Sequence, residues 1–361
     1  MVSALPDLLV EARTGSYPVV IAPAASARAG EFARLLANGS RVLVVCDHNT
    51  AEIAGNRVAL DAGAEILELE PGEGSKSFHH LESVCAAAAE HGLDRGSVIV
   101  AVGGGVIGDL AGTAAALYLR GVRFVQVPTN VLAMVDSSIG GKVGVNLPAG
   151  KNLVGAFKPP EAVFIDPDLL SGLPDREFRG GMAEVIKSGL IADVALLELL
   201  ERETARILKR DGDVLLEMLA RTCAVKVGVV SRDETEGGER AILNYGHTVA
   251  HALEAASGFS PGLSHGEAVA VGMGAAARVG LAVGVTPRDV IPVQERLLRA
   301  YGLPLTSPIE LEADAVMAAM SHDKKAVAGR IRWVLLDRLG QASWGHLVEP
   351  DVVREAVRAA L

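Results

Sequence analysis

The sequence predicts an α/β domain with a mostly parallel sheet, followed by a mainly α-helical domain. In the first half of the chain, short runs rich in Val and Ile alternate with helical segments, a pattern typical of parallel strands covered by helices. After about residue 175, Gly and Pro become sparse and helical periods dominate. We therefore expect two domains in the 361 residues, 1–174 and 175–361.

The first domain is expected to alternate strands and helices with short connections. Apolar or alternating segments predict strands at 8–13, 17–22, 41–47, 64–70, 97–102 and 122–127. Helical patterns fall at 27–38, 78–91 and 109–119. The order of these elements indicates a largely parallel sheet.

Helical periods fill most of the second domain. They predict helices at 177–190, 194–209, 214–231, 241–257, 267–283, 287–301 and 312–321. A β-rich segment at 330–337 interrupts them, and a terminal helix begins near Pro350.

Composition narrows the function classes. The formal net charge is −10, which argues against binding nucleic acid or an anionic membrane through overall charge. The three cysteines, Cys46, Cys85 and Cys223, show no metal-ligand spacing and are expected to be buried thiols. The N-terminus lacks the basic region of a signal peptide, and the chain has no convincing membrane span. We expect a cytoplasmic protein without nucleic-acid or membrane partners.

Three strings in the second domain carry metal-binding chemistry. Histidine stands beside glycine in Asn244–His251 and in Leu263–Val269, and Gly180–Lys187 offers a carboxylate. Two imidazoles and one carboxylate from separate helices would give a divalent metal three protein ligands and leave positions for water or substrate. This pattern is typical of a catalytic site rather than a structural one.

The ligand set is not fixed by spacing. Glu184 and His247 are candidates, and either His251 or His265 could complete the site. Ordinary buried or surface histidines are the competing interpretation. Ser264 or His265 could also serve to cap the following helix.

A glycine motif predicts a nucleotide site in the first domain. Gly103-x-Gly105-x-x-Gly108 follows an expected strand, and its glycines would let a pyrophosphate approach the start of a helix. The next strand ends without the acid that usually contacts the ribose, so Asp47, at the end of an earlier strand, is the better candidate. The alternative is a turn that merely packs a helix tightly on the sheet.

Small and polar residues are frequent between residues 120 and 152, and we expect loops there that converge on a ligand. Several cations would suit a phosphorylated or carboxylated substrate: Lys142, Lys151, Lys187, Lys226 and Arg240. Lys187 shares a helix face with Glu184. Taken singly, Lys226 and Lys209 favour a solvated surface charge, whereas Lys142 and Lys151 stand in glycine-flanked turns.

Eight strings occur in order along the chain: Gly103–Asp109, Arg120–Thr129, Val135–Lys142, Gly150–Asn152, Ala183–Lys187, Leu243–Thr248, Ser264–Val269 and Asp323–Lys325. With them the chain resembles the 3-dehydroquinate synthase family of the sugar phosphate cyclase superfamily over essentially its whole length. The resemblance implies a Rossmann-like NAD-binding N-terminal domain and a helical, dehydroquinate synthase-like C-terminal domain with a catalytic Zn²⁺ or Co²⁺. It also implies a homodimer.

The activity implied by the resemblance is a step of the shikimate pathway. It converts 3-deoxy-D-arabino-heptulosonate 7-phosphate to 3-dehydroquinate and phosphate, by transient NAD-dependent oxidation, phosphate elimination, re-reduction and aldol closure. An enzyme of this kind is a carbon–oxygen lyase.

The resemblance also assigns residues by position. The metal ligands would be Glu184, His247 and His265. The NAD site would be lined by Asp47, Glu73, Lys76, Gly104, Gly105, Val106, Asp109, Thr129, Asn130, Lys142, Lys151, Leu169 and Gly172. The substrate would contact Asp136, Lys142, Asn152, Lys187, Lys226, Arg240, Asn244, His251, one of Lys324 and Lys325, and Arg120 from the neighbouring subunit.

Within that set, the catalytic residues would be His251, Lys142, Lys187, Arg240 and Asn244. His251 is the candidate for proton transfer, because imidazole titrates near neutrality. Lys142 and Arg240 would fix the phosphate.

Two other enzyme classes compete with this interpretation. A sister cyclase, such as a 2-deoxy-scyllo-inosose or 2-epi-5-epi-valiolone synthase, would use the same metal and NAD with another sugar phosphate. A metal-dependent alcohol or polyol dehydrogenase would release NADH stoichiometrically and would not need the phosphate-directed lysines. A non-enzymatic scaffold would leave the set of cations unexplained.

Overall fold

The computed structural model describes residues 8–13, 15–148, 150–321, 326–327 and 330–361. The chain separates into two compact units. The first unit runs to Pro174 and adds Leu215–Glu234, and the second consists of Asp175–Val214 and Thr235–Leu361. Helix α8 (Gly212–Arg232) begins in the second unit and continues in the first.

The first unit is built on a seven-stranded sheet, which confirms the predicted mostly parallel α/β fold. The strand order is β1-β2-β9-β6-β5-β3-β4, and every pair except β1–β2 is parallel. The strands are β1 (Leu8–Val10), β2 (Tyr17–Ile21), β3 (Val42–Asp47), β4 (Glu65–Leu69), β5 (Val98–Gly103), β6 (Arg123–Pro128) and β9 (Ala162–Ile165). Strands β3 and β5 are apolar along nearly their whole length because both faces of the sheet are covered.

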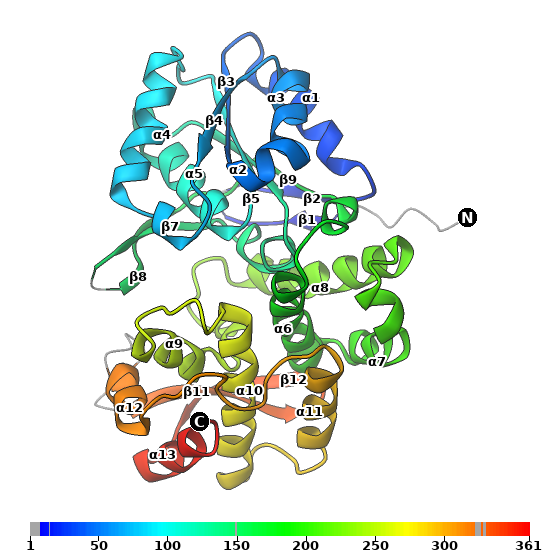
Figure 1. The fold of residues 1–361 in the computed structure, drawn as a ribbon, viewed down its shortest axis with the longest axis vertical. Coiled ribbons are helices and arrows are strands. Elements are labelled where there is room, and N and C mark those ends of the chain that lie inside the picture. The colour runs from blue at the N-terminus through cyan, green and yellow to red at the C-terminus, as the bar shows by residue number, and fades with distance from the viewer. Residues whose placement is uncertain (1–7, 14, 149, 322–325, 328–329) are drawn as a thin grey trace. The chain divides into compact units, whose positions relative to one another are not determined.

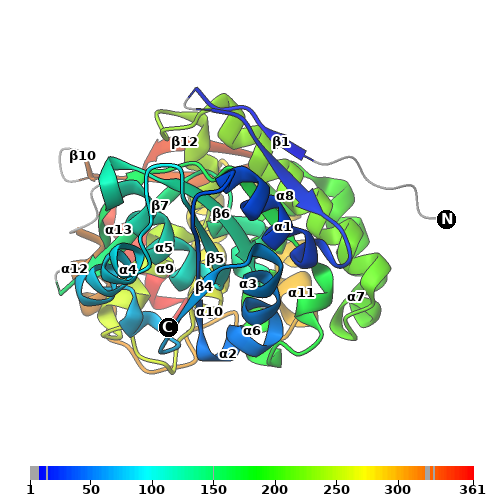
Figure 2. The ribbon, with the colours of Figure 1, turned by 90° about the horizontal axis from the view of Figure 1, so that it is seen from above.

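Helices pack on both faces of this sheet. Figures 1 and 2 show α1 and α3 on one side and α4 and α5 on the other, in agreement with two separate apolar clusters. The helices are α1 (Ala25–Ala37), α2 (His48–Thr50), α3 (Asn56–Ala62), α4 (Phe78–Glu90) and α5 (Gly105–Leu117). The same unit contains an antiparallel hairpin, β7 (Lys142–Leu147) and β8 (Gly150–Phe157).

The second unit is mainly helical, as predicted. Its helices are α6 (Asp175–Ala192), α7 (Val194–Leu208), α9 (His247–Ala256), α10 (His265–Ala282), α11 (Val290–Ala300), α12 (Ala313–Ser321) and α13 (Pro350–Arg358). A small antiparallel sheet joins them, with strands β10 (Ala326–Val327), β11 (Arg330–Arg338) and β12 (Gln341–Leu347). Within the described part of the chain, every helix is too short or too polar to cross a bilayer.

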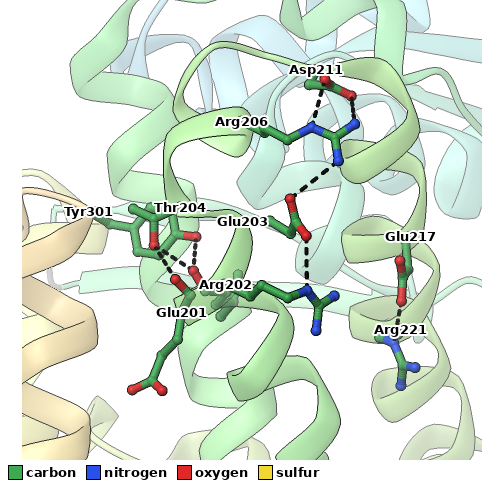
Figure 3. A network of polar contacts seen from close by, with 10 residues as sticks. Glu201, Arg202, Glu203, Thr204, Arg206, Asp211, Glu217, Arg221 and Tyr301 are labelled. Atoms are coloured by element: carbon green, nitrogen blue, oxygen red, sulfur yellow. Dashed lines mark hydrogen bonds and ion pairs between the residues drawn. The ribbon is translucent and has the colours of Figure 1, made fainter.

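Charged side chains form ion pairs at the carboxyl end of α7. Arg206 contacts both carboxylate oxygens of Asp211, at 3.0 and 3.1 Å, and lies 3.2 Å from Glu203 (Figure 3). The Tyr301 hydroxyl donates to the carbonyl oxygen of Leu200 in α7 at 3.0 Å. The buried tyrosine thereby fixes the middle of α7.

Three sequence predictions need correction. The helix expected from Asp109 begins at Gly105, so the glycine motif itself forms its first turn. The helix expected at 241–257 is broken at Gly246, whose φ of +81° ends a 3-10 helix before α9 begins. Loops are expected between residues 120 and 152, whereas Lys142–Leu147 and Gly150–Phe157 form the β7–β8 hairpin.

The predicted burial of the thiols is confirmed for Cys46 and Cys223, whereas Cys85 is half-buried. Burial raises the pKa of Cys46 and of Cys223 to about 12, which makes both thiols poor nucleophiles.

Candidate active site and metal centre

Glycines let the helices of the second unit approach one another closely. A Cβ added to Gly266 of α10 would lie 2.0 Å from the carbonyl oxygen of Gly180 in α6. A Cβ added to Gly272 of α10 would lie 2.1 Å from the carbonyl oxygen of Gly246, directly before α9. Any larger residue would push these backbones apart, so glycine at these positions allows α10 to pack against both α6 and α9.

This packing brings together one side chain from each of the three helices. Among the described residues, Glu184, His247 and His265 form a group whose ligand atoms all lie within 4.8 Å of one another. Nε2 of His247 is 3.5 Å and Nε2 of His265 is 3.7 Å from the same oxygen, Oε1 of Glu184. Two imidazole nitrogens and a carboxylate match the open, three-ligand arrangement of a catalytic zinc site.

The Glu184 carboxylate is the feature that best fits a cation. Its side chain is 2% exposed, and one of its oxygens, Oε2, forms an ion pair with Lys187. Burial would raise the pKa of Glu184, but the Lys187 ammonium and the two imidazoles hold it well below its usual range. Oε2 of Glu184 pairs with Lys187, whereas Oε1 faces the two imidazole nitrogens, so two nitrogens and one oxygen converge as the ligands of a divalent metal would.

The two imidazoles differ in protonation. Burial, reinforced by the nearby Lys187 ammonium, holds the pKa of His247 well below its ordinary value, so this ring is neutral and can bind a metal. Burial also acts to lower the pKa of His265, but its contacts with Glu184 and Glu254 outweigh burial and raise the pKa to about 10. A metal binding at His265 would therefore release a proton.

His251 lies beside the group. One turn along α9, its ring centroid is 5.3 Å from that of His247 and 6.4 Å from that of His265. The side chain is exposed in the single chain. The close set of ligand atoms includes His265 and leaves His251 as a neighbour, a choice that spacing in the sequence could not make.

The capping interpretation of Ser264 also holds. Ser264 is the N-cap of α10, and Glu267 returns the interaction by accepting from the Ser264 amide at 2.8 Å. Arg176 of α6 binds Glu267 at 2.8 Å and donates to the carbonyl oxygens of Pro261 and Gly262. Capping and metal binding are therefore not alternatives, because Ser264 caps the helix and His265 is its first residue.

Three other predicted substrate residues of the second unit lie in α6 or in the 3-10 helix that precedes α9. Lys187 pairs with Glu184 one helical turn away and is 2% exposed. Arg240 is buried in the 3-10 helix before the break, and Asn244 donates to Glu236 at 2.5 Å. Lys324 and Lys325 lie outside the described residues. The sequence interpretation overlooked two acids of this region, Glu236 and Glu254.

In the first unit, the predicted cofactor residues gather at the carboxyl ends of two neighbouring strands. Asp47 ends β3, and the glycine motif follows β5, its parallel neighbour. The chain leaves β3 for β4 on one side and returns to β5 on the other, which makes this pair the point where the strand order reverses. Nucleotides bind at such points in open α/β sheets.

The glycine motif fits both of its interpretations. Gly104 is the N-cap of α5, and no side chain of the described residues caps that end, which leaves amides for a phosphate. A Cβ at Gly104 would lie 2.8 Å from Nδ2 of Asn130. A Cβ at Gly108 would lie 2.7 Å from Oε1 of Gln126 in β6, so this glycine serves packing of α5 on the sheet.

Polar contacts connect the other residues that the sequence predicts for the cofactor site. Lys76 pairs with Asp109 of α5, and burial outweighs that partner and raises the pKa of Asp109. Asn146 of β7 donates to Glu73 at 2.7 Å and accepts from the amide of Asn152 at 2.9 Å. The β7–β8 hairpin is thereby fixed to the turn that carries Glu73 and Lys76.

Lys226, which the sequence alone suggested is a solvated surface charge, is buried. It is 7% exposed and donates to the carbonyl oxygen of Asp136 at 2.6 Å, while also pairing with the carboxylate of Asp136. Its partner lies 90 residues away in the chain, so no local pattern could reveal the burial.

The other assigned residues of the first unit vary in exposure. Thr129 is buried, and its amide donates to the carbonyl oxygen of Gly103 at 3.1 Å. Leu169 packs against the apolar cluster under α1, and Gly172 faces open space among the described residues. Half-buried or exposed side chains are those of Val106, Lys151, Lys142 and Arg120.

Sequence comparison gives close and nearly full-length relatives. Family models for the 3-dehydroquinate synthase N-terminal and C-terminal regions match residues 66–180 and 181–326. A 3-dehydroquinate synthase of Rippkaea orientalis is 43% identical over 349 residues, which cover 95% of each chain. A 3-dehydroquinate synthase of Caulobacter vibrioides is 44% identical over 356 residues, covering 96% of this chain and 95% of that one.

Solved structures share the fold over the whole chain. A 2-deoxy-scyllo-inosose synthase complexed with carbaglucose-6-phosphate, NAD⁺ and Co²⁺ is 28% identical, with a TM-score of 0.88 and coverage of 99% and 100%. The 2-epi-5-epi-valiolone synthase of Streptomyces hygroscopicus with NAD⁺ and Zn²⁺ is 27% identical, with a TM-score of 0.85 and coverage of 100% and 99%. An iron-containing alcohol dehydrogenase of Thermococcus thioreducens, 15% identical with a TM-score of 0.71 and 98% coverage of each chain, shares the fold alone.

Proposed function

The chain belongs to the 3-dehydroquinate synthase family, and from this premise we propose that it converts 3-deoxy-D-arabino-heptulosonate 7-phosphate to 3-dehydroquinate and phosphate. The observation that carries the proposal is the identity of 43–44% to 3-dehydroquinate synthases along 95% or more of this chain. The side-chain group of Glu184, His247 and His265 adds chemistry suited to such a reaction.

We assign the metal to that group and NAD to the carboxyl ends of β3 and β5, which gives residues 1–174 the cofactor and residues 175–361 the metal. When bound, the metal would polarise substrate oxygens and the nicotinamide would accept and return a hydride. Zn²⁺ or Co²⁺ suits the two nitrogens and one oxygen of the group. Asp47 would contact ribose hydroxyls, and the amides at the start of α5 would bind the pyrophosphate.

Positively charged side chains would bind the phosphate that leaves the substrate. Phosphate leaves the substrate as an anion, and groups that bind it more strongly as charge develops lower the barrier. We assign this role to Lys142 and Arg240. Lys187 compensates the Glu184 carboxylate and places a further positive charge beside the metal group.

His251 is the residue assigned to proton transfer. Its ring stands next to the two ligand imidazoles without belonging to the close set of ligand atoms. An imidazole at that position can hold or release a proton near neutral pH while the ligand rings stay occupied. Asn244, held by Glu236, would orient a substrate hydroxyl.

The alternative functions differ in what the cations must recognise. Compared with sedoheptulose 7-phosphate and glucose 6-phosphate, only the heptulosonate carries a carboxylate as well as a phosphate, so its recognition gains most from a site with several cations. A dehydrogenase would not need these cations. We further propose a cytoplasmic carbon–oxygen lyase that acts as a homodimer, with Arg120 reaching the substrate of the neighbouring subunit.

Turnover tests the proposal directly. The purified protein is mixed with 3-deoxy-D-arabino-heptulosonate 7-phosphate, substoichiometric NAD⁺ and Zn²⁺, and both phosphate and dehydroquinate are measured. Many turnovers per NAD⁺ with dehydroquinate formed are expected. Turnover only with sedoheptulose 7-phosphate or glucose 6-phosphate would move the function to a sister cyclase. Stoichiometric NADH without phosphate release would mean a dehydrogenase.

A further inference from the structure

Both histidines of the metal group present the same ring nitrogen to Glu184 and the other ring nitrogen to a second oxygen. Their Nε2 atoms face Oε1 of Glu184, at 3.5 and 3.7 Å. Nδ1 of His247 lies 3.3 Å from the carbonyl oxygen of Tyr245, and Nδ1 of His265 lies 3.5 Å from Oε1 of Glu254. Metal-bound histidines usually have such an oxygen behind the ring, which fixes the tautomer and the ring orientation.

We propose that Glu254 is a positioning residue that orients His265 for the metal. The inference rests on the metal site proposed above and adds a residue to it. With a proton held at Nδ1 toward Glu254, the lone pair of Nε2 points into the group formed with Glu184 and His247. His247 obtains the same orientation from a backbone carbonyl, which no substitution can remove.

The location of Glu254 is unfavourable for stability by itself. The side chain is 5% exposed and stands in the last turn of α9, which ends at Ala256. A carboxylate near the carboxyl end of a helix opposes the helix dipole, and burying it adds a desolvation cost. The contact with His265 offsets part of that cost.

Glu254 lies on the same face of α9 as the two histidines of that helix. His247, His251 and Glu254 are at positions i, i+4 and i+7, which share one side of an α-helix. Because α10 packs against this helix through Gly246 and Gly272, the first residue of α10, His265, comes within reach of both ends of the row.

The negative charge of Glu254 affects His265 in addition to orienting its ring. At 3.5 Å, the contact between Nδ1 and Oε1 is longer than an ideal hydrogen bond. An anion behind the imidazole nevertheless makes Nε2 a stronger electron-pair donor, and this effect does not need a short bond. Glutamine at position 254 would keep the shape and lose the charge.

The test measures metal affinity rather than turnover. Zn²⁺ binding to the full-length parent, Glu254→Gln and the exposed control Glu198→Gln is measured by competition with a chromophoric chelator. The Co²⁺ absorption spectrum and the thermal unfolding of the metal-free proteins are recorded in parallel. We expect roughly 10- to 100-fold weaker Zn²⁺ binding and an altered Co²⁺ spectrum in Glu254→Gln. The metal-free variant should stay folded with a lower unfolding temperature, because the ion pair between His265 and Glu254 is lost. The control should match the parent in all three.

The outcomes separate the possible failures. A loss of affinity below about fivefold in Glu254→Gln, beside a parent that binds Zn²⁺ through Glu184, would overturn the positioning role and leave the metal site intact. A parent that binds no Zn²⁺ would overturn the metal site itself and this inference with it. Should Glu254→Gln fail to fold, Glu254→Asp is measured instead, because aspartate moves the carboxylate away from His265 and keeps its charge. A loss of Zn²⁺ affinity below about fivefold in that variant would likewise overturn the positioning role.

Discussion

Lys187 and Glu184 pair inside α6, one helical turn apart, with side chains that are each 2% exposed. A lysine this deeply buried loses its hydration, and the carboxylate beside it offsets that loss. The same carboxylate faces two imidazole nitrogens. Lys187 is therefore a positive partner of Glu184 when no metal is bound, beside the protonated His265.

Replacing Lys187 by Met should destabilise the metal-free protein far more than the metal-loaded one. Breaking a buried pair leaves an uncompensated charge, so we expect a loss of about 3 kcal/mol in the free energy of unfolding with chelator present. With Zn²⁺ bound, the variant should lose less free energy of unfolding relative to the parent, because the metal supplies the missing positive charge. Denaturant unfolding with and without Zn²⁺ measures both values, with the exposed Lys209→Met as control. An equal loss in both conditions would show that the metal and Lys187 do not share Glu184.

Removing a ligand should remove the metal without unfolding the second unit. Glu184→Gln and His265→Ala are each expected to yield folded protein with far less than one bound zinc, since three protein ligands are the minimum for such a site. His265→Ala leaves the Ser264–Glu267 cap in place, so α10 should still begin at the same residue. Elemental analysis after dialysis measures the zinc, and His251→Ala should retain it. Full occupancy in either ligand variant would refute the assignment.

The cap of α10 should make stability depend on pH. Burial would raise the pKa of Glu267, but hydrogen bonds from Arg176 and Ser264 hold it below the ordinary value of 4.5. A carboxyl whose pKa is lowered on folding contributes stability above its unfolded pKa, and that contribution is lost as the pH falls through the folded pKa.

Glu267→Gln should accordingly be less stable than the parent at neutral pH. We expect about 0.5 kcal/mol, because the ion pair with Arg176 is lost but is screened at a guanidinium that is more than half exposed. Glutamine can still accept from the Ser264 amide, so the cap itself remains. The difference should shrink as the pH falls below 4.5, where Glu267 of the parent takes up its proton. Urea unfolding across this pH range tests it. Glu295→Gln, which removes an exposed pair with Arg299, serves as control, and a pH-independent difference would contradict the cap's ionic role.

Asp47 should matter for NAD more than for the fold. Its carboxylate accepts from the Thr50 amide at 3.0 Å and caps α2, a role that asparagine can also fill. Asp47→Asn keeps the cap and removes the charge that we assign to the ribose, so we expect NAD⁺ to bind about tenfold more weakly with little change in unfolding temperature. Titration calorimetry measures the affinity, with the exposed Glu52→Gln as control. Unchanged NAD⁺ affinity would place the ribose elsewhere.

Apolar strands and long helices were predictable because their signals are local. The runs ending at Asp47 and Gly103 read as buried parallel strands, and they are neighbours in the sheet. The β7–β8 hairpin was missed because its glycines suggested a loop. A Cβ at Gly155 would lie 2.1 Å from the carbonyl oxygen of Val143, so this glycine permits close pairing of strands instead.

The parts of the site that depend on long-range contacts were not predictable from local pattern. The choice between His251 and His265 needs the packing of α9 on α10, and the burial of Lys226 needs Asp136. Glu254 carried a weak signal, its i+7 spacing from His247, which becomes meaningful only once His265 is placed beside it.

Lys142 should contribute to catalysis in a way that an ordinary surface lysine does not. Gly140 and Gly141, both with positive φ, turn the chain just before Lys142, and its exposed side chain begins β7. If it binds the substrate phosphate, Lys142→Ala removes a charge-assisted contact of about 1.5–3 kcal/mol and lowers kcat/KM roughly 10- to 100-fold. Lys209→Ala, also exposed, should stay within about twofold of the parent. Steady-state kinetics with saturating NAD⁺ and Zn²⁺ compares the two, and equal losses would exclude Lys142 from the phosphate site.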